Sequence, residues 1–187
     1  MDPDPEILFL LFASIDLLTT FNAIILIVLL ISSALVSGTE VAFFSLSQTD
    51  LNELSNNGKE ENIIVNLLEK PRKLLATILI TNNFINILIV LLFASLSKTL
   101  FGNFNLKLPI LSFEIPIRFL LEIVLVTFLI LLFGEVLPKI YASRNALRFS
   151  KKMSKFIQTT NKLLTPFSLP LITLTKWIEN KLGSKNS

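Results

Sequence analysis

The chain has 187 residues, of which 52% are hydrophobic, with a mean hydropathy of +0.68 and a formal net charge of +3. So apolar a composition is unusual for a soluble domain, which must also cover its own surface with polar groups. The absence of Cys and His excludes disulfides and thiolate metal sites, and it removes the commonest zinc ligand and the commonest general base.

The first apolar stretch predicts a membrane-spanning helix over about residues 17–46. Between Asp16 and Glu40 there are 23 consecutive residues without a charge, and about 20 residues at 1.5 Å each are enough to cross a bilayer. The first six residues are acidic where a signal peptide needs positive charge, so we expect this span to be retained as an anchor. Residues 7–18 either lie at the outer interface or lengthen the span.

A second span is predicted over about residues 74–97. Twenty-four uncharged residues separate Lys73 from Lys98, which again passes the length test. The preceding connection, residues 50–73, is polar and contains the loop signal Asn56-Asn57-Gly58. It is expected to lie outside the membrane.

The third apolar run is shorter and is interrupted by Glu122. It reaches spanning length only over about residues 117–137, and a buried soluble helix would fit the same run if it stood alone. Because it follows two clear spans, we interpret it as a third. The connection at residues 101–116 is still strongly apolar, which predicts short interfacial or re-entrant pieces.

From residue 142 onward the chain is amphipathic. Apolar residues recur at helical spacing among lysines, as expected for juxtamembrane helices on the cytoplasmic face: Phe149, Met153, Phe156, Ile157, Leu163 and Leu164. The predicted fold class is an all-α membrane protein with three transmembrane helices plus short interfacial and juxtamembrane helices. Residues 1–141 form the transmembrane domain, and residues 142–187 form the juxtamembrane helices and a hydrophilic linker.

The distribution of Lys and Arg predicts the orientation. Fourteen lie after the first and third spans and three lie after the second, so the positive-inside rule places the N-terminus outside and the C-terminus in the cytoplasm. We therefore expect a multi-pass protein of the bacterial inner membrane. The basic tail suits anionic lipid headgroups, and it does not argue for nucleic acid.

Polar groups in the first span form the stretch around Ser37. Ser37 and Glu40 are three residues apart and share a helix face, and Gly38 allows another backbone to approach closely. The alternative is that the helix simply leaves the membrane here, with Glu40 at the position where it reaches water.

The second span carries three amides within five residues. Asn82 and Asn86 are four residues apart and share one helix face, with Asn83 beside them. Each amide offers an oxygen to a cation or a hydrogen bond to a neighbouring helix. Interhelical bonding would explain one Asn, whereas three together favour a functional role.

The third span ends in Gly134-Glu135-Val136-Leu137-Pro138-Lys139. Pro138 has no N–H, so the carbonyl of Gly134 loses its helical partner beside the carboxylate of Glu135. Transporters use such breaks to coordinate ions. The alternative is a helix that simply ends at Pro138, with Glu135 reaching water.

In the predicted topology, the three polar stretches lie at one level in the inner half of the bilayer. They offer a hydroxyl, amide oxygens, a freed carbonyl and carboxylates. Hard cations such as Mg²⁺ and Ca²⁺ take such an all-oxygen set, and Na⁺ is an alternative or coupled ion.

Together the stretches resemble the CorC/CNNM (cyclin M-like) family of magnesium transporters over about residues 17–181. That family shows S-G-x-E-x-A, G-N-x-x-x-N and G-E-x-x-P-K in its three spans, and this chain departs from it at Thr81, where the family usually has Gly. The acidic start also resembles the gliding-motility-associated GldE branch.

The resemblance implies a homodimer with an intramembrane Mg²⁺ site open to the cytoplasm and sodium-coupled Mg²⁺ export. The implied ligands are Ser37, Asn82, Asn86, Gly134 (backbone) and Glu135, and we expect Glu40, Asn83, Pro138 and Lys139 to lie around them. Family members continue into an ATP-binding pair of CBS domains, so we expect this chain to be the membrane part of a longer protein.

Two other functions fit parts of the sequence. One is a membrane anchor or assembly partner in a gliding-motility or secretion complex, in which the polar residues serve helix packing. The other is an intramembrane enzyme with a Ser37–Lys139 dyad. Without His or Cys the catalytic inventory is poor, so we expect no enzyme.

Overall fold

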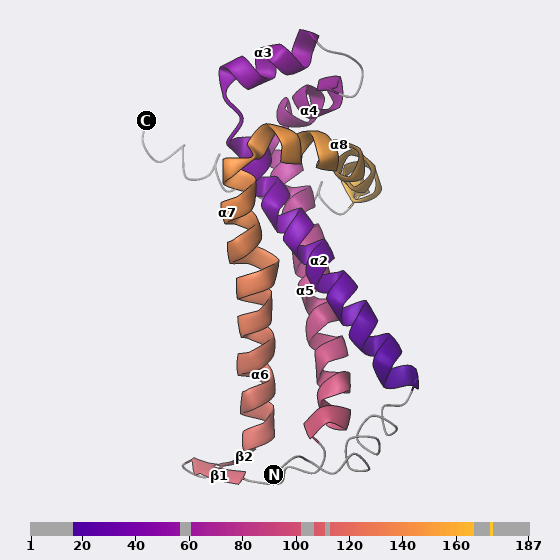
Figure 1. Cartoon of the computed structure of the whole chain (residues 1–187), viewed down its shortest axis with the longest axis vertical. Helices are drawn as coiled ribbons and strands as arrows, with labels where there is room; N and C mark the ends of the chain where they lie inside the picture. Colours follow the sequence, from indigo (N-terminus) through magenta and orange to yellow (C-terminus); the bar gives the residue numbers. More distant parts are fainter. Residues whose placement is uncertain (1–16, 57–60, 102–106, 111–112, 167–172, 174–187) are drawn as a thin grey trace, which may run out of the picture.

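The computed structural model describes residues 17–56, 61–101, 107–110, 113–166 and 173. Its main elements are three long helices (Figure 1): α2 (Leu17–Phe44), α5 (Pro71–Phe101), and a third formed by α6 (Ile117–Leu129), η1 (Ile130–Val136) and α7 (Leu137–Arg144) in succession. All three are long and apolar enough to cross a membrane. The predicted fold class, a helical membrane protein with three spans, is confirmed.

The apolar side chains of the spans largely face outwards. Only 28%, 33% and 11% of the most apolar part of each span is buried within the chain. Leu91, Val124 and Phe128, for example, are all more than half exposed. A soluble protein would bury such surfaces, whereas a bilayer solvates them.

Two helices run further than the sequence indicated. The second span begins at Pro71, because proline is well suited to the first turn of a helix. The third continues through Pro138 to Arg144, although its end was expected near Leu137. Here the helix widens into the π-helical segment η1, in which the N–H of Leu137 donates to the carbonyl of Leu132, five residues back.

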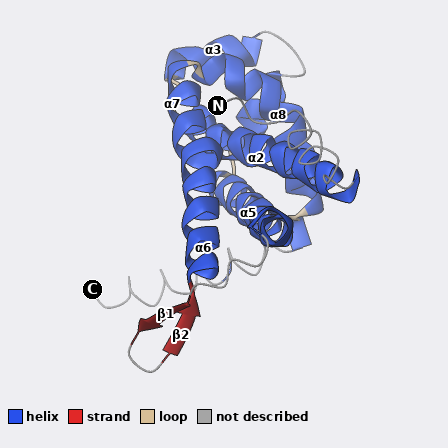
Figure 2. Cartoon of the chain, turned by 60° about the horizontal axis from the view of Figure 1, so that its bottom comes forward, coloured by secondary structure: helices blue, strands red, loops and turns tan. Residues whose placement is uncertain are grey.

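A short antiparallel hairpin lies between the second and third spans, where the sequence predicted short interfacial or re-entrant pieces (Figure 2). Strand β1 (Lys107–Ile110) pairs with β2 (Phe113–Pro116), with Lys107 opposite Pro116 and Ile110 opposite Phe113. Ile and Phe favour extended backbone, and both strands of a two-stranded ribbon are edges, where proline is tolerated. The sequence did not indicate that these pieces are strands, because hydropathy does not distinguish a short strand from a short helix.

Three shorter helices gather at the opposite end of the spans from the hairpin (Figure 1): α3 (Gln48–Asn56), α4 (Glu61–Leu68) and α8 (Ala146–Leu163). We refer to this as the α8 end. Helix α8 buries Met153 and Ile157 while Lys152 and Lys155 stay exposed, which confirms the predicted amphipathic helix. Of the apolar segment predicted at residues 7–18, only residues 17 and 18 are described, and they belong to α2.

A capping box begins α3. The hydroxyl of Ser47 accepts a hydrogen bond from the N–H of Asp50 (3.2 Å), and the carboxylate of Asp50 accepts one from the N–H of Ser47 (2.8 Å). Hydrogen bonds from the side chain and then the backbone of Ser47 lower the pKa of Asp50 from its usual value. This bonding turns the chain sharply after α2, so that α3 lies across the α8 end.

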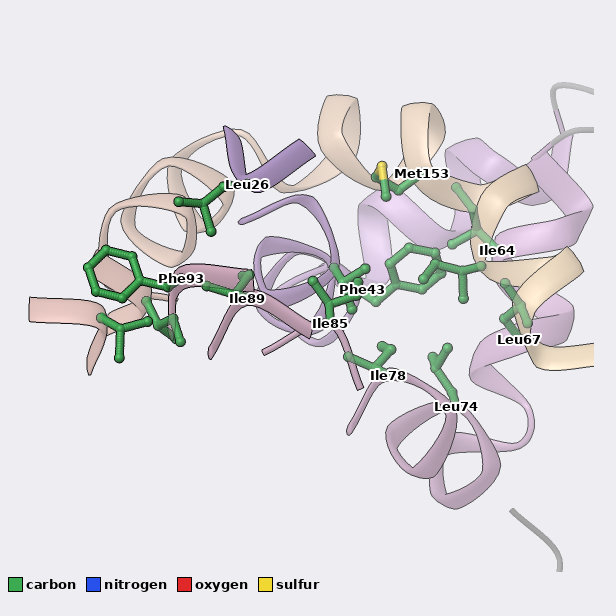
Figure 3. Close-up of a cluster of buried hydrophobic side chains, with 14 of the residues drawn as sticks. Leu26, Phe43, Ile64, Leu67, Leu74, Ile78, Ile85, Ile89, Phe93 and Met153 are labelled. Atoms are coloured by element: carbon green, nitrogen blue, oxygen red, sulfur yellow. The ribbon is translucent and has the colours of Figure 1, made fainter. Parts of the chain in front are cut away.

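The buried core extends along the spans into the α8 end (Figure 3). Leu26 and Ile89 belong to its part between α2 and α5, while Phe43, Ile64 and Met153 join α2, α4 and α8. Because apolar burial is concentrated where α2, α5 and α8 meet, that region fixes the relative positions of the spans.

Candidate metal centre

Four polar side chains from three helices meet inside the bundle. The hydroxyl of Ser33 on α2 donates to the Oδ1 atoms of Asn86 (2.7 Å) and Asn82 (3.3 Å) on α5. The Nδ2 of Asn86 donates in turn to Oε1 of Glu135 on η1 (3.3 Å). Asn86 and Glu135, predicted to share one level from their positions in different spans, are therefore in direct contact.

The hydrogen bonds in this cluster leave a surplus of acceptors. Ser33 is fully buried and has one hydroxyl proton, yet two amide oxygens face it. The proton can satisfy only one of them fully at a time. The second oxygen can therefore accept a further partner from the adjoining cavity, either a water or a cation.

Helical spacing explains why these side chains converge. Asn82 and Asn86 are one turn apart on α5, and Ser33 and Ser37 are one turn apart on α2. Ser33 was not among the residues predicted to form the site. It lies four residues before Ser37 and on the same helix face, which could have indicated it, but it is outside the stretch from Ser37 to Glu40.

Ser37 lines a cavity next to the cluster. Its side chain is 2% exposed, and within the described part of the chain its Oγ has no hydrogen-bond partner. The cavity has a volume of about 130 Å³, and Glu40 and Asn82 also line it, together with Leu75, Ile78 and Leu79. About 10–15 Å³ of such volume holds one water, so the cavity accommodates a partly hydrated ion.

Gly134 brings the backbone of η1 close to α2. A Cβ at this position would lie 2.9 Å from the Oγ of Ser33, closer than such atoms normally approach. Pro138 cannot donate to the carbonyl of Gly134, and a π-helical segment accommodates the proline without ending the helix. Such segments often occur at functional sites.

Gly38 forms a second close approach, towards the α8 end. A Cβ there would lie 2.9 Å from Cζ of Phe149 and 3.3 Å from the carbonyl oxygen of Pro138. Beside it, the Nζ of Lys139 lies 3.2 Å from Oε2 of Glu40. Four residues were expected to lie around the ligands. Three of them take part in the contact between α2 and α7: Glu40, Pro138 and Lys139.

Asn83 does not join the cluster. It is exposed, and its Nδ2 donates to the carbonyl of Leu79 in its own helix (2.9 Å). Of the three neighbouring amides, helical geometry therefore brings only Asn82 and Asn86 to the other spans.

The donor set suits a hard cation. Among the described residues there is no group of three or more His, Cys, Asp or Glu that could hold a metal ion. The cluster instead combines the carboxylate of Glu135 with neutral amide and hydroxyl oxygens. Mg²⁺ is bound through one or two carboxylates and commonly keeps several waters, so the composition fits it.

Glu122 also lies inside a predicted span, but its contacts differ from those of Glu135. Its carboxylate accepts hydrogen bonds from Arg118, one turn earlier (2.6 Å), and from the buried hydroxyl of Ser97 on α5. These bonds neutralise it and join α5 to α6 towards the hairpin. This cluster lies apart from the residues around Asn86.

The chain matches a known protein family, and its relatives include two bacterial UPF0053 proteins. A family model described as the cyclin M transmembrane N-terminal domain matches residues 24–187. A UPF0053 protein of Haemophilus influenzae is 32% identical over 92% of this chain and 38% of its own length. The UPF0053 inner membrane protein YfjD of Escherichia coli is 27% identical over 82% of this chain and 33% of its own. The chain thus spans less than two fifths of either relative.

Proposed function

Because the chain belongs to the cyclin M transmembrane domain family, which is associated with divalent cation transport, we propose that it carries Mg²⁺ across the membrane through the cluster around Asn86. The observation that supports this most strongly is the direct contact of Asn86 with both Ser33 and Glu135. Three spans thereby contribute oxygens to one point inside the bundle.

The ligands in this proposal are those predicted from the sequence, with one addition. Ser37, Asn82, Asn86, Glu135 and the carbonyl of Gly134 surround the ion, and Ser33 adds its hydroxyl, as its contacts with both asparagines suggest. One carboxylate balances half of the charge of Mg²⁺. The neutral oxygens and retained waters complete a site that binds the ion and also releases it.

The route to the cluster is the cavity beside Ser37. Asn82 lines the cavity and also accepts a hydrogen bond from Ser33, so it joins the cavity to the cluster. We place the α8 end in the cytoplasm, since most Lys and Arg residues lie on that side. The cavity then gives the cytoplasmic ion access to the site, and coupling to Na⁺ would drive its export.

A homodimer is part of the proposal. The third span is only 11% buried within the chain, so a large apolar surface of α6 is available for a second copy. The CBS domains would belong to a longer protein. The GldE branch and a gliding-motility role rest on the first six residues, which lie outside the described part of the chain, and they stay predictions.

Titration of Mg²⁺ into the purified domain in detergent tests this function. A ligand that binds only the folded state raises the unfolding temperature with concentration, and we expect Mg²⁺ to do so while K⁺ at equal ionic strength does not. Repeating the titration with Na⁺ tests the coupling ion. The variant Asn83→Ala is the matched control, because Asn83 bonds only within its own helix. An unfolding temperature of the wild type that does not depend on Mg²⁺ would contradict the proposal.

A further inference from the structure

An ion pair lies beside the cavity that leads to the proposed site. Glu40 lines this cavity with Ser37 and Asn82, and its Oε2 lies 3.2 Å from the Nζ of Lys139. The two side chains are 42% and 39% exposed, respectively. An ion that enters the cavity from solvent therefore meets a carboxylate whose partner is already a cation.

We propose that Lys139 is a tethered cation that holds the carboxylate of Glu40 when no divalent ion is bound, and that an arriving Mg²⁺ displaces it. This inference rests on the proposed function. Glu40 is then the first carboxylate the ion contacts, and Glu135, deeper in the bundle, is the second. Lys139 sets how readily the ion exchanges between solvent and the cavity.

The exposure of the pair makes such an exchange feasible. A partly exposed ion pair is solvated and screened, so it contributes little net stability and is readily broken. Mg²⁺ carries twice the charge of an ammonium and is attracted to Glu40 more strongly at the same distance. The displaced ammonium stays attached to α7, so it can return to Glu40 when the ion moves on.

Lys139 is also well placed to respond to the deeper site. It follows Glu135 by four residues along one continuous helix, a spacing that puts both on a similar face. The pair with Glu40 joins α2 to α7 beside the close approach of Gly38 to Pro138. Displacement of Lys139 therefore removes a link between α2 and α7, the continuation of the helix that carries Glu135.

The simpler interpretation is that the pair only holds α2 and α7 together. A charge reversal separates the two roles. In the double variant Glu40→Lys with Lys139→Glu the ion pair can re-form, but the cavity wall carries an ammonium where it had a carboxylate. A structural link predicts that this variant regains both stability and Mg²⁺ affinity. A tethered cation predicts that its stability is close to that of the wild type while its Mg²⁺ affinity does not recover.

The experiment measures the Mg²⁺ dissociation constant of each variant by thermal-shift titration at low salt. We expect Glu40→Gln to bind roughly tenfold more weakly, and Lys139→Met to bind roughly threefold more tightly because no ammonium competes. Both differences should shrink at high ionic strength, since the pair is exposed. The reversed double variant should keep the weak affinity of Glu40→Gln.

The contact between Glu53 and Lys151 provides the matched control. These residues join α3 to α8 with a distance of 3.7 Å between Nζ and Oε1, and neither lines the cavity. Lys151→Met removes the same charge as Lys139→Met, and it should leave the affinity unchanged. Equal effects of the two lysine variants, or full recovery of affinity in the reversed variant, would overturn the inference and leave the proposed function standing. Absence of Mg²⁺ binding in the wild type would overturn both.

Discussion

Replacement of Glu135 by Ala is expected to abolish the stabilisation of the domain by Mg²⁺. Glu135 is the carboxylate in contact with Asn86, and Mg²⁺ is bound in proteins through at least one such group. At a Mg²⁺ concentration one hundred times the wild-type dissociation constant, the wild type gains about 2.7 kcal/mol. The variant should gain none. Thermal unfolding with and without Mg²⁺ measures the difference.

Stability without Mg²⁺ distinguishes a lost ligand from a damaged fold. A carboxylate inside a membrane protein is costly, so Glu135→Ala should unfold no more easily than the wild type when Mg²⁺ is absent. Glu53→Ala, which removes a carboxylate from α3 far from the cluster, should keep the full response. Asn86→Ala should lose the response as Glu135→Ala does. Full stabilisation of either Asn86→Ala or Glu135→Ala by Mg²⁺ would contradict the assignment of these ligands.

Replacement of Gly134 by Ala is expected to destabilise the domain and weaken Mg²⁺ binding together. The added Cβ would lie 2.9 Å from the Oγ of Ser33, so the hydroxyl must move from its position between Asn82 and Asn86. Overpacking of this kind costs about 1–3 kcal/mol. Thermal or denaturant unfolding of the variant measures the loss.

A double-mutant cycle with Ser33→Ala identifies the cause of that loss. Outside the backbone of its own helix, and among the described residues, the Oγ of Ser33 is the only atom within 3.4 Å of the added group, and the Cβ of Ser33 is at an ordinary 3.5 Å. In the Ser33→Ala background, Gly134→Ala should therefore cost much less than in the wild type, and the two effects should be clearly non-additive. Additive effects would mean that the close approach of η1 to α2 does not exist as described.

The spans could be predicted because the bilayer imposes a length on them. Charge-free runs from Asp16 to Glu40 and from Lys73 to Lys98 exceed the length needed to cross it. No comparable length requirement fixes where a helix ends once it has crossed the bilayer. Pro138 was expected to end the third span, but a π-helical segment absorbs it and the helix continues to Arg144. The hairpin at residues 107–116 was missed because strand pairing depends on partners that composition does not reveal.

The faces of the polar helices could be predicted in part. The spacing of Asn82 and Asn86 indicated one shared face, and both are bonded to Ser33. Asn83, next to them in sequence, lies a third of a turn away and is exposed. Ser33 was missed because a lone serine in a span commonly bonds to its own helix, as Ser32 does to Val28. Only the packing of α2 against α5 and η1 distinguishes the two serines.

Crystals grown with Mn²⁺ provide the most direct test that oxygens from three spans hold one divalent ion. Mn²⁺ favours the same carboxylate, carbonyl and water ligands as Mg²⁺ and gives an anomalous signal. We predict one anomalous peak per chain, about 2–2.5 Å from both the carboxylate of Glu135 and the amide oxygen of Asn86. Peaks confined to surface carboxylates such as Glu53, with none between α2, α5 and η1, would contradict the proposed site.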